Sequence, residues 1–300
     1  MRTIVYILVF FLFGGCSKTT VDFERTSLIF GRQKIEVLTA HELFENFITA
    51  KGDYSKDVFT PIKNEFIENA EYPFILESIE GAINPDQKLK AFHEKLKALD
   101  FKQLIAPELQ KIVGELPGPD TKILFIPANP AYVDFFMQNQ IAVTAITVGA
   151  GKIIVSINPE SDFWEDQLPY VLAHEYHHSV WTARNFTTKD FTPLEYLIFE
   201  GRADSFATML YPDINNPWTH MIDARTEKKV WNIIKPELFK RETEMNDLMM
   251  VGNEEIPYCS GYTIGFNIVQ KFKKNNPDIS DRIIIDLDPA HILELSLYEE

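Results

Sequence analysis

The stretch VLAHEYHHSVW, residues 171–181, constrains the fold more than any other part of this chain, because three histidines and a glutamate fill four of five consecutive positions in an otherwise apolar segment. Residues 163–181 have the pattern of a helix, and Val171, Leu172 and Val180 predict that it is buried. Ionisable side chains are costly to bury without partners. We therefore expect these four side chains to bind something inside the folded protein.

His174, Glu175 and His178 form the pattern H-E-x-x-H. Residues four apart lie on one face of a helix, so both imidazoles can reach a single Zn²⁺ ion at about 2.0–2.1 Å. Glu175 is turned by about 100° from His174, which places it beside the ion, within reach of a zinc-bound water. His177 is expected to hydrogen-bond a backbone carbonyl or to face solvent.

A catalytic zinc keeps three protein ligands and one open position. The metzincin pattern is excluded, because Trp181 and Arg184 stand where it requires glycine and histidine. The next predicted helix, residues 192–212, carries Glu200 and, one turn later, Asp204. We expect Glu200 to be the third ligand and Asp204 to accept the outer ring N–H of a ligating histidine.

Other interpretations of this second helix stay open. Glu200 and Asp204 would form a solvated face if they paired with Arg202 or with lysines, and Glu195 is a rival carboxylate. Gly201, which lets two helices approach closely, favours the metal site.

The H-E-x-x-H helix followed by a helix with E-G-x-A-D resembles the gluzincin metallopeptidases, and more narrowly the YjaZ-like family of predicted bacterial zinc-dependent proteases, whose function is unknown and which are often lipoproteins. The resemblance covers roughly residues 121–272 and includes LAHEYHH, EGRAD and GYTIGF. It implies a zincin fold, whose small twisted sheet has an edge strand that pairs with an extended substrate. Gluzincins share the glutamate ligand with an aspartate four residues later, which supports Glu200 and Asp204. The resemblance implies no particular substrate.

Two imidazoles and a carboxylate leave zinc enough positive charge to lower the pKa of its water towards 7. Glu175 then takes a proton from that water and delivers it to the leaving amine. The oxyanion needs a further donor, for which Tyr262 is the first candidate, while Tyr258 and His220 are weaker ones. Each of the three is otherwise explained as plain structure.

The chain as a whole predicts an α+β fold, zincin-like, with a small, mostly antiparallel sheet, an active-site helix and helical N- and C-terminal regions. Apolar residues recur at helical spacing from residue 39 to about 115, residues 121–128, 141–148 and 152–158 predict strands, and residues 261–275 predict an amphipathic helix. A hairpin from Val143 to Ile157 is expected to pair with a bound peptide. We predict a helical N-terminal region, residues 37–118, and a zincin-like metallopeptidase domain, residues 119–300.

The first residues predict export and lipidation. Ile4 to Phe13 is an apolar run too short for a membrane span of about 20 residues but typical of a secretory signal. Gly14 and Gly15 before Cys16 resemble a bacterial lipobox, although Phe13 stands where leucine is usual. We predict a signal peptide at residues 1–15, a lipid on Cys16 and a tether at residues 16–36. An ordinary signal peptide and an uncleaved anchor are the alternatives.

Net charge of −15 argues against nucleic acid as a partner and against docking on anionic lipid through a basic patch. The sequence therefore predicts an extracytoplasmic zinc metallopeptidase with one zinc ion, anchored by lipid to a bacterial membrane and acting on a peptide or protein. The alternatives are a zinc-dependent hydrolase of a non-peptide amide, an inactive zinc-binding or scaffold lipoprotein, and a metal-free interaction protein.

Overall fold

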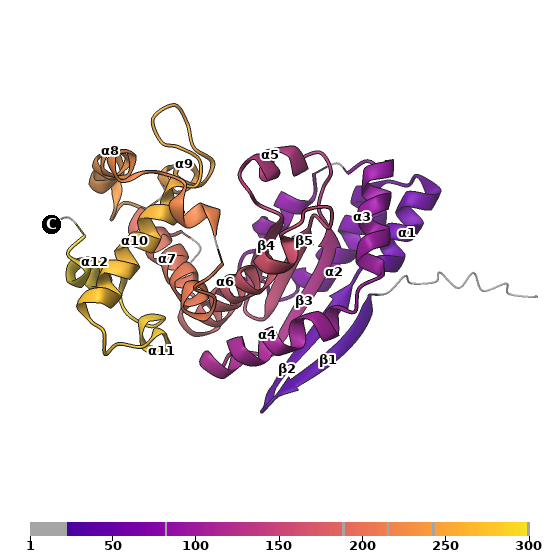
Figure 1. Cartoon of the computed structure of the whole chain (residues 1–300), viewed down its shortest axis with the longest axis horizontal. Coiled ribbons are helices and arrows are strands. Elements are labelled where there is room, and N and C mark those ends of the chain that lie inside the picture. The colour runs from indigo at the N-terminus through magenta and orange to yellow at the C-terminus, as the bar shows by residue number, and fades with distance from the viewer. Residues whose placement is uncertain (1–22, 82, 188–189, 215, 242–243, 299–300) are drawn as a thin grey trace, which may run out of the picture.

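The computed structural model describes residues 23–298 except 82, 188–189, 215 and 242–243, and its architecture is α+β, as the sequence predicts. Figure 1 shows a half built around a sheet, a C-terminal half made of helices, and helix α6 between them. The strands are β1 (Glu24–Phe30), β2 (Gln33–Thr39), β3 (Thr121–Pro127), β4 (Val143–Gly149) and β5 (Lys152–Ile157).

The sheet has the strand order β1-β2-β3-β5-β4. Its outer pairs, β1 with β2 and β4 with β5, are antiparallel, and its inner pairs, β2 with β3 and β3 with β5, are parallel. The sheet is thus mixed rather than mostly antiparallel. The reason lies in the connections: the long segment after β2 crosses over to β3 in the same direction, whereas the chain after β3 first forms the edge strand β4 and then turns back through a hairpin into β5.

Strand β1 and most of β2 lie within residues 16–36, for which the sequence predicts a tether, so for residues 24–36 that prediction is wrong. The two strands form a hairpin whose Phe30 pairs with Gln33 across a two-residue turn, and Gly31 there has φ +63°. Since β2 pairs with β3, strands from both sides of the predicted boundary at residues 118/119 share one sheet. The N-terminal region is therefore part of the same sheet structure as the strands beyond that boundary.

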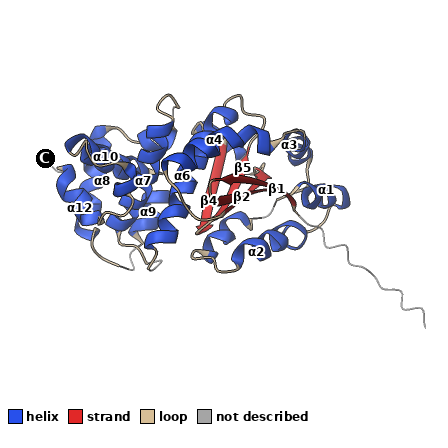
Figure 2. Cartoon of the chain, turned by 90° about the horizontal axis from the view of Figure 1, so that it is seen from below, coloured by secondary structure: helices blue, strands red, loops and turns tan. Residues whose placement is uncertain are grey.

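The helices of the N-terminal region pack on this sheet. They are α1 (His41–Ala50), the π-helix η1 (Ser55–Phe59), α2 (Thr60–Ile67), the 3-10 helix η2 (Pro73–Ile79), α3 (Gln87–Lys97) and α4 (Phe101–Glu115). Figure 2 shows α2 and α4 on opposite sides of the sheet. Within β3, Leu124 joins the core under α1 to α3, whereas Ile123 and Phe125 join the core under α4 and α6. Because side chains alternate along a strand, this sheet is buried on both faces.

The rest of the chain is helical except for the β4–β5 hairpin. Its helices are α5 (Val133–Gln138), α6 (Trp164–Asn185), α7 (Pro193–Leu210), η3 (Pro217–His220), α8 (Ala224–Ile234), η4 (Lys235–Glu237), α9 (Met245–Val251), α10 (Ser260–Asn275), α11 (Asp281–Ile284) and α12 (Pro289–Ser296). Helices α6, α7 and α10 confirm the predicted helices at residues 163–181, 192–212 and 261–275. A separate apolar core joins α7, α8 and α10.

Helices α7 and α10 touch through their backbones. A Cβ atom on Gly201 would lie 2.2 Å from the Gly265 carbonyl oxygen, and one on Gly265 would lie 2.1 Å from that of Leu197. Gly201 does allow a close helix approach, but its neighbour is α10, not the H-E-x-x-H helix α6. Consecutive residues of a helix point in directions about 100° apart. Because Glu200 points towards α6, the next residue, Gly201, lies on the side of α7 that faces α10.

The predicted signal peptide and Cys16 lie outside the described residues. None of the helices that the structure describes is both long and apolar enough to cross a membrane.

Candidate metal centre

Hydrogen bonds connect one side of helix α6 to the sheet. The Thr147 hydroxyl on β4 lies 2.7 Å from Glu175 Oε2 and 2.9 Å from the Glu175 backbone oxygen. One turn further along α6, Ser179 Oγ accepts a hydrogen bond of 2.7 Å from the Gly151 N–H in the β4–β5 turn. Edge strand β4 therefore runs directly alongside the H-E-x-x-H sequence.

Helix α7 begins with a capping box. Thr192 Oγ1 accepts from the Glu195 N–H, and the Glu195 carboxylate accepts from the Thr192 N–H at 2.7 Å. Such reciprocal bonds satisfy two of the free N–H groups at a helix start. Glu195, the rival carboxylate, thus closes the N-terminus of α7, and Glu200 is the glutamate that faces α6.

His174, His178 and Glu200 come together as a buried cluster that could hold a metal ion. The two histidine Nε2 atoms are 2.9 Å apart, and Glu200 Oε2 lies 3.3 Å from that of His174 and 3.2 Å from that of His178. Ligand atoms about 2.0–2.1 Å from a tetrahedral zinc are about 3.3 Å from each other. The triangle of donor atoms therefore has the size that zinc requires, and its donor types are those that zinc accepts.

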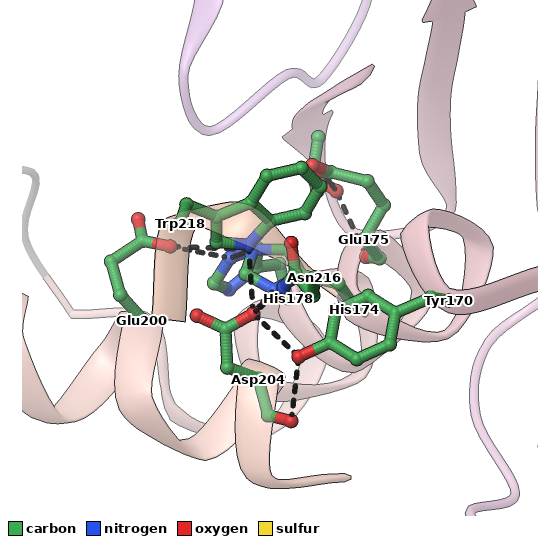
Figure 3. A network of polar contacts seen from close by, with 9 residues as sticks. Tyr170, His174, Glu175, His178, Glu200, Asp204, Asn216 and Trp218 are labelled. Atoms are coloured by element: carbon green, nitrogen blue, oxygen red, sulfur yellow. Dashed lines mark hydrogen bonds and ion pairs between the residues drawn. The ribbon is translucent and has the colours of Figure 1, made fainter. Parts of the chain in front are cut away.

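Asp204 holds His174 in place. Its carboxylate is fully buried, and Oδ1 lies 3.0 Å from His174 Nδ1 (Figure 3). The same oxygen accepts hydrogen bonds from Tyr170 Oη, Asn216 Nδ2 and Trp218 Nε1 at 3.1, 3.3 and 3.0 Å. With Nδ1 occupied in this way, Nε2 of His174 is the nitrogen that faces Glu200.

The charges in this cluster favour an ionised Glu200. Burial raises the pKa of Glu200, but His178 and His174 outweigh that effect and lower the pKa to about 2. Burial likewise lowers the pKa of His174, whereas Asp204 and Glu200 together hold it well above its ordinary value. Glu200 is therefore a carboxylate at neutral pH, and a cation is favoured at the centre of the cluster.

Apart from the contact of its Nε2 with Glu200, His178 is held by packing, and no carboxylate is bonded to its Nδ1 among the described residues. Its ring stacks on Phe199 with 3.9 Å between ring centroids and 19° between planes, and the Trp181 ring meets Phe199 edge-on with 5.0 Å between centroids. His178 Nδ1 is buried and has no hydrogen-bond partner among the described residues. The two candidate ligands on α6 are thus oriented by different means.

His177 points away from this cluster. It is only 1% exposed, its ring lies 5.7 Å from that of Phe206, and burial lowers its pKa well below the ordinary value. The expectation that it faces solvent is wrong. A carbonyl partner is not found for its Nδ1 in the described part of the chain.

The three oxyanion candidates lie at different places. The Tyr262 ring lies 6.3 Å from that of His174, whereas Tyr258 packs on Phe135 at 5.2 Å and the exposed His220 packs on Phe266. Burial, with a smaller effect of Glu200, raises the pKa of Tyr262 well above its ordinary value. The Tyr262 hydroxyl therefore keeps its proton and can donate it in a hydrogen bond.

Two cavities meet at this centre. One has a volume of about 570 Å³ and is bordered by His174, Glu175, His178, Glu200 and Tyr262. The other, of about 130 Å³, is bordered by His174, Glu175 and Tyr262 and also by Tyr258 and Trp218. Ala145 of β4 borders both cavities, so the open space continues along the edge strand on both sides of the cluster.

Sequence reasoning missed Thr147, Tyr170, Asn216 and Trp218. Tyr170 precedes His174 by one helical turn, so helical spacing could have found it. Thr147 lies in a strand that the sequence predicts, but its contact with Glu175 depends on how β4 packs on α6. Asn216 and Trp218 follow α7 in a connecting segment, and nothing in the sequence associates them with Asp204.

Comparisons with known proteins agree with this chemistry. A family model described as "Predicted Zn-dependent protease (DUF2268)" matches residues 101–294. The chain is 27% identical over 190 residues to the uncharacterized protein YjaZ of Bacillus subtilis, in a match that covers 59% of this chain and 68% of YjaZ. It is 29% identical over 134 residues to the uncharacterized protein YjfC of the same bacterium, covering 41% of this chain and 44% of YjfC. No solved structure matches the chain.

Proposed function

The chain belongs to the DUF2268 family of predicted Zn-dependent proteases, and on this premise we propose that it is a zinc metallopeptidase that hydrolyses peptide bonds. The observation that carries the proposal is the buried triangle of His174, His178 and Glu200 with Glu175 beside it. Its donor atoms are 2.9–3.3 Å apart, which fits one zinc ion.

Zinc held by these residues supplies a Lewis acid, which polarises a carbonyl and lowers the pKa of a water molecule. The chain's own residues do the rest. Glu175 borders the same cavity as the triangle, so its carboxylate accepts a proton from the attacking water and then delivers it to the leaving amine. Thr147 donates to Glu175 Oε2, which fixes the orientation of this carboxylate.

Two further residues have positioning and stabilising roles in the proposal. Asp204 keeps His174 in the tautomer whose Nε2 faces the ion. Tyr262, which borders both cavities and keeps its proton, donates a hydrogen bond to the oxyanion of the scissile carbonyl. Neither residue needs to change its protonation state during the reaction.

The proposal is tested with elemental analysis and a peptide-cleavage assay on three proteins. The wild type should carry one zinc per chain and cleave peptides. Glu175→Gln should keep its zinc and lose turnover by about 10²-fold or more, whereas His178→Ala should lose both. Full activity in Glu175→Gln would refute the role of Glu175 as the base. Cleavage of small amides without any cleavage of peptides would show that the substrate is a non-peptide amide.

We also propose that the protein works outside the cytoplasm, anchored to a bacterial membrane by a lipid on Cys16. The support is the apolar run of residues 4–13 followed by Gly14, Gly15 and Cys16. Labelled fatty acid should be incorporated into the wild type and not into Cys16→Ala, and the variant should leave the membrane fraction. Equal labelling of both proteins would refute the anchor.

A further inference from the structure

The larger cavity beside the metal centre is bordered by large apolar side chains from both halves of the molecule. Phe74 and Ile75 of η2 border it from the N-terminal region, and Phe191, Phe199 and Met250 border it from the C-terminal half. Phe74 is 48% exposed and Met250 is 40% exposed. Large apolar side chains that border a cavity and remain partly open to water are typical of a binding site.

Tyr72 connects η2 with strand β4 and with helix α6. Its N–H donates to the Val148 oxygen of β4 at 3.0 Å, and its hydroxyl accepts from Thr182 on α6 at 3.3 Å. Its ring also meets Phe186 edge-on, with 5.1 Å between centroids. Since Thr182 is one turn after His178, the segment that carries Phe74 has a defined position relative to the zinc ligands.

Strand β4 offers its backbone to the same cavity. It is an edge strand of the sheet that the structure describes, with β5 on its other side. On that side the Asn158 N–H donates to the Ala142 oxygen at 2.9 Å. Hydrogen-bonded pairs alternate in an antiparallel ladder, so the backbone groups of Ala145 point to the open edge. A peptide paired there would direct alternate side chains into the cavity.

The charges around the cavity are negative. Asp247 is exposed at its border, together with Glu175 and Glu200 of the metal centre, and none of its described lining residues is Lys or Arg. An acidic side chain would therefore meet like charge and an apolar wall. A large uncharged apolar side chain would bury its surface there at about 25 cal/mol per Å².

We propose that η2 and the facing residues of α7 and α9 form a side-chain subsite that selects a large apolar residue next to the cleaved bond of an extended peptide. The inference rests on the proposed peptidase function and names the substrate class. Helix η2 lies outside residues 101–294, the part matched by the family model. The preference is thus determined in part by the N-terminal region of this chain.

The first test is a cleavage profile. Short peptides of random sequence are digested with the zinc-loaded wild type, and the new ends are sequenced by mass spectrometry. We expect Phe, Tyr, Leu or Met at one position beside the cleaved bond and depletion of Asp and Glu there. In Phe74→Ala and in Met250→Ala, the preference for Phe over Ala at that position should fall about tenfold.

Phe239→Ala is the matched control, because Phe239 is 68% exposed and does not border the cavity. Its cleavage profile should equal that of the wild type, and melting curves and zinc content should show that all variants are folded. A wild-type profile without an apolar preference overturns the subsite. So does a preference that is unchanged in both cavity variants.

A binding measurement separates failure of the subsite from failure of the peptidase. If the wild type cleaves no peptide faster than Glu175→Gln, the proposed function is wrong. The same random peptides are then passed over immobilised, zinc-loaded Glu175→Gln protein with and without Phe74→Ala. The subsite is supported if the retained peptides are rich in Phe, Tyr, Leu and Met for the protein with Phe74 but not for the Phe74→Ala protein. It is overturned if the retained peptides have the same composition as the input peptides.

Discussion

The sheet half and the C-terminal helical half contact helix α6 in different ways. Next to the H-E-x-x-H sequence, the sheet half donates hydrogen bonds from Thr147 to Glu175 and from Gly151 to Ser179. The C-terminal half contributes the carboxylates of Glu200 and Asp204, both directed at His174. The proposed general base is therefore oriented from one side and the proposed metal ligands from the other.

Because of this difference, we expect substitutions to affect metal binding and proton transfer separately. A substitution in the C-terminal half should act on the affinity for zinc, because it moves or loosens a ligand. A substitution in β4 should act on turnover, because it loosens Glu175 and leaves the ligands in place.

Gly201→Ala should disturb the whole C-terminal half. The new Cβ atom would lie 2.2 Å from the Gly265 carbonyl oxygen, so α7 and α10 must move apart at the turn that carries Glu200. We expect the free energy of unfolding to fall by about 3 kcal/mol and zinc content to fall with it, as measured by urea unfolding and elemental analysis.

The matched control is Gly114→Ala in α4 of the sheet half, where a Cβ atom meets nothing within 4 Å. Alanine is favoured over glycine inside a helix by about 0.5–1 kcal/mol, so this variant should be slightly more stable and keep its zinc. Equal stability of the two variants would contradict the close contact of α7 and α10.

Asp204→Asn should weaken zinc binding by about 10- to 100-fold. The amide removes the charge beside His174 Nδ1 and disturbs an oxygen that also accepts from Tyr170, Asn216 and Trp218. Competition with a fluorescent chelator measures the affinity. At saturating zinc the variant should recover much of its turnover, and unchanged affinity would assign Asp204 a role in packing only.

Zinc affinity should rise with pH by about tenfold per unit over the range in which His174 loses its proton. Nearby Asp204 and Glu200 raise the pKa of His174 in the metal-free protein, so a proton must leave before Nε2 can bind zinc. Glu200, with a pKa lowered to about 2, contributes no such dependence near neutral pH. Affinity measured from pH 5 to 9 should rise and then level off, and in Asp204→Asn it should level off at lower pH.

Thr147→Val should reduce turnover by about tenfold, because Glu175 loses a hydrogen bond to its charged oxygen. Zinc affinity should stay within about twofold of the wild type, because Thr147 is hydrogen-bonded to Glu175 and not to any of the three candidate metal ligands. Valine has nearly the shape of threonine, so the strand should keep its place. A loss of zinc in this variant would show that the two halves do not act separately.

Much of the fold is predictable from the sequence because its helices and the strands β3, β4 and β5 carry strong sequence patterns. The strands at 121–128, 141–148 and 152–158 and the three helices around the metal centre were found within a few residues of their ends. The β1–β2 hairpin was missed although Ile35 and Val37 alternate with polar residues and Gly31 marks the turn. Short strands with charged residues on one face resemble a polar linker when the neighbouring strand is more than 80 residues away.

Helical spacing is enough to put His174 and His178 on one face of their helix and Glu200 and Asp204 on one face of the next. That these two faces meet, that Gly201 packs against α10, and that Thr147 and η2 border the same cavity follows only from the folded structure. The difference is one of distance along the chain. Spacing along one helix follows from its own backbone geometry, whereas contacts between elements depend on how every apolar face in the molecule is buried at once.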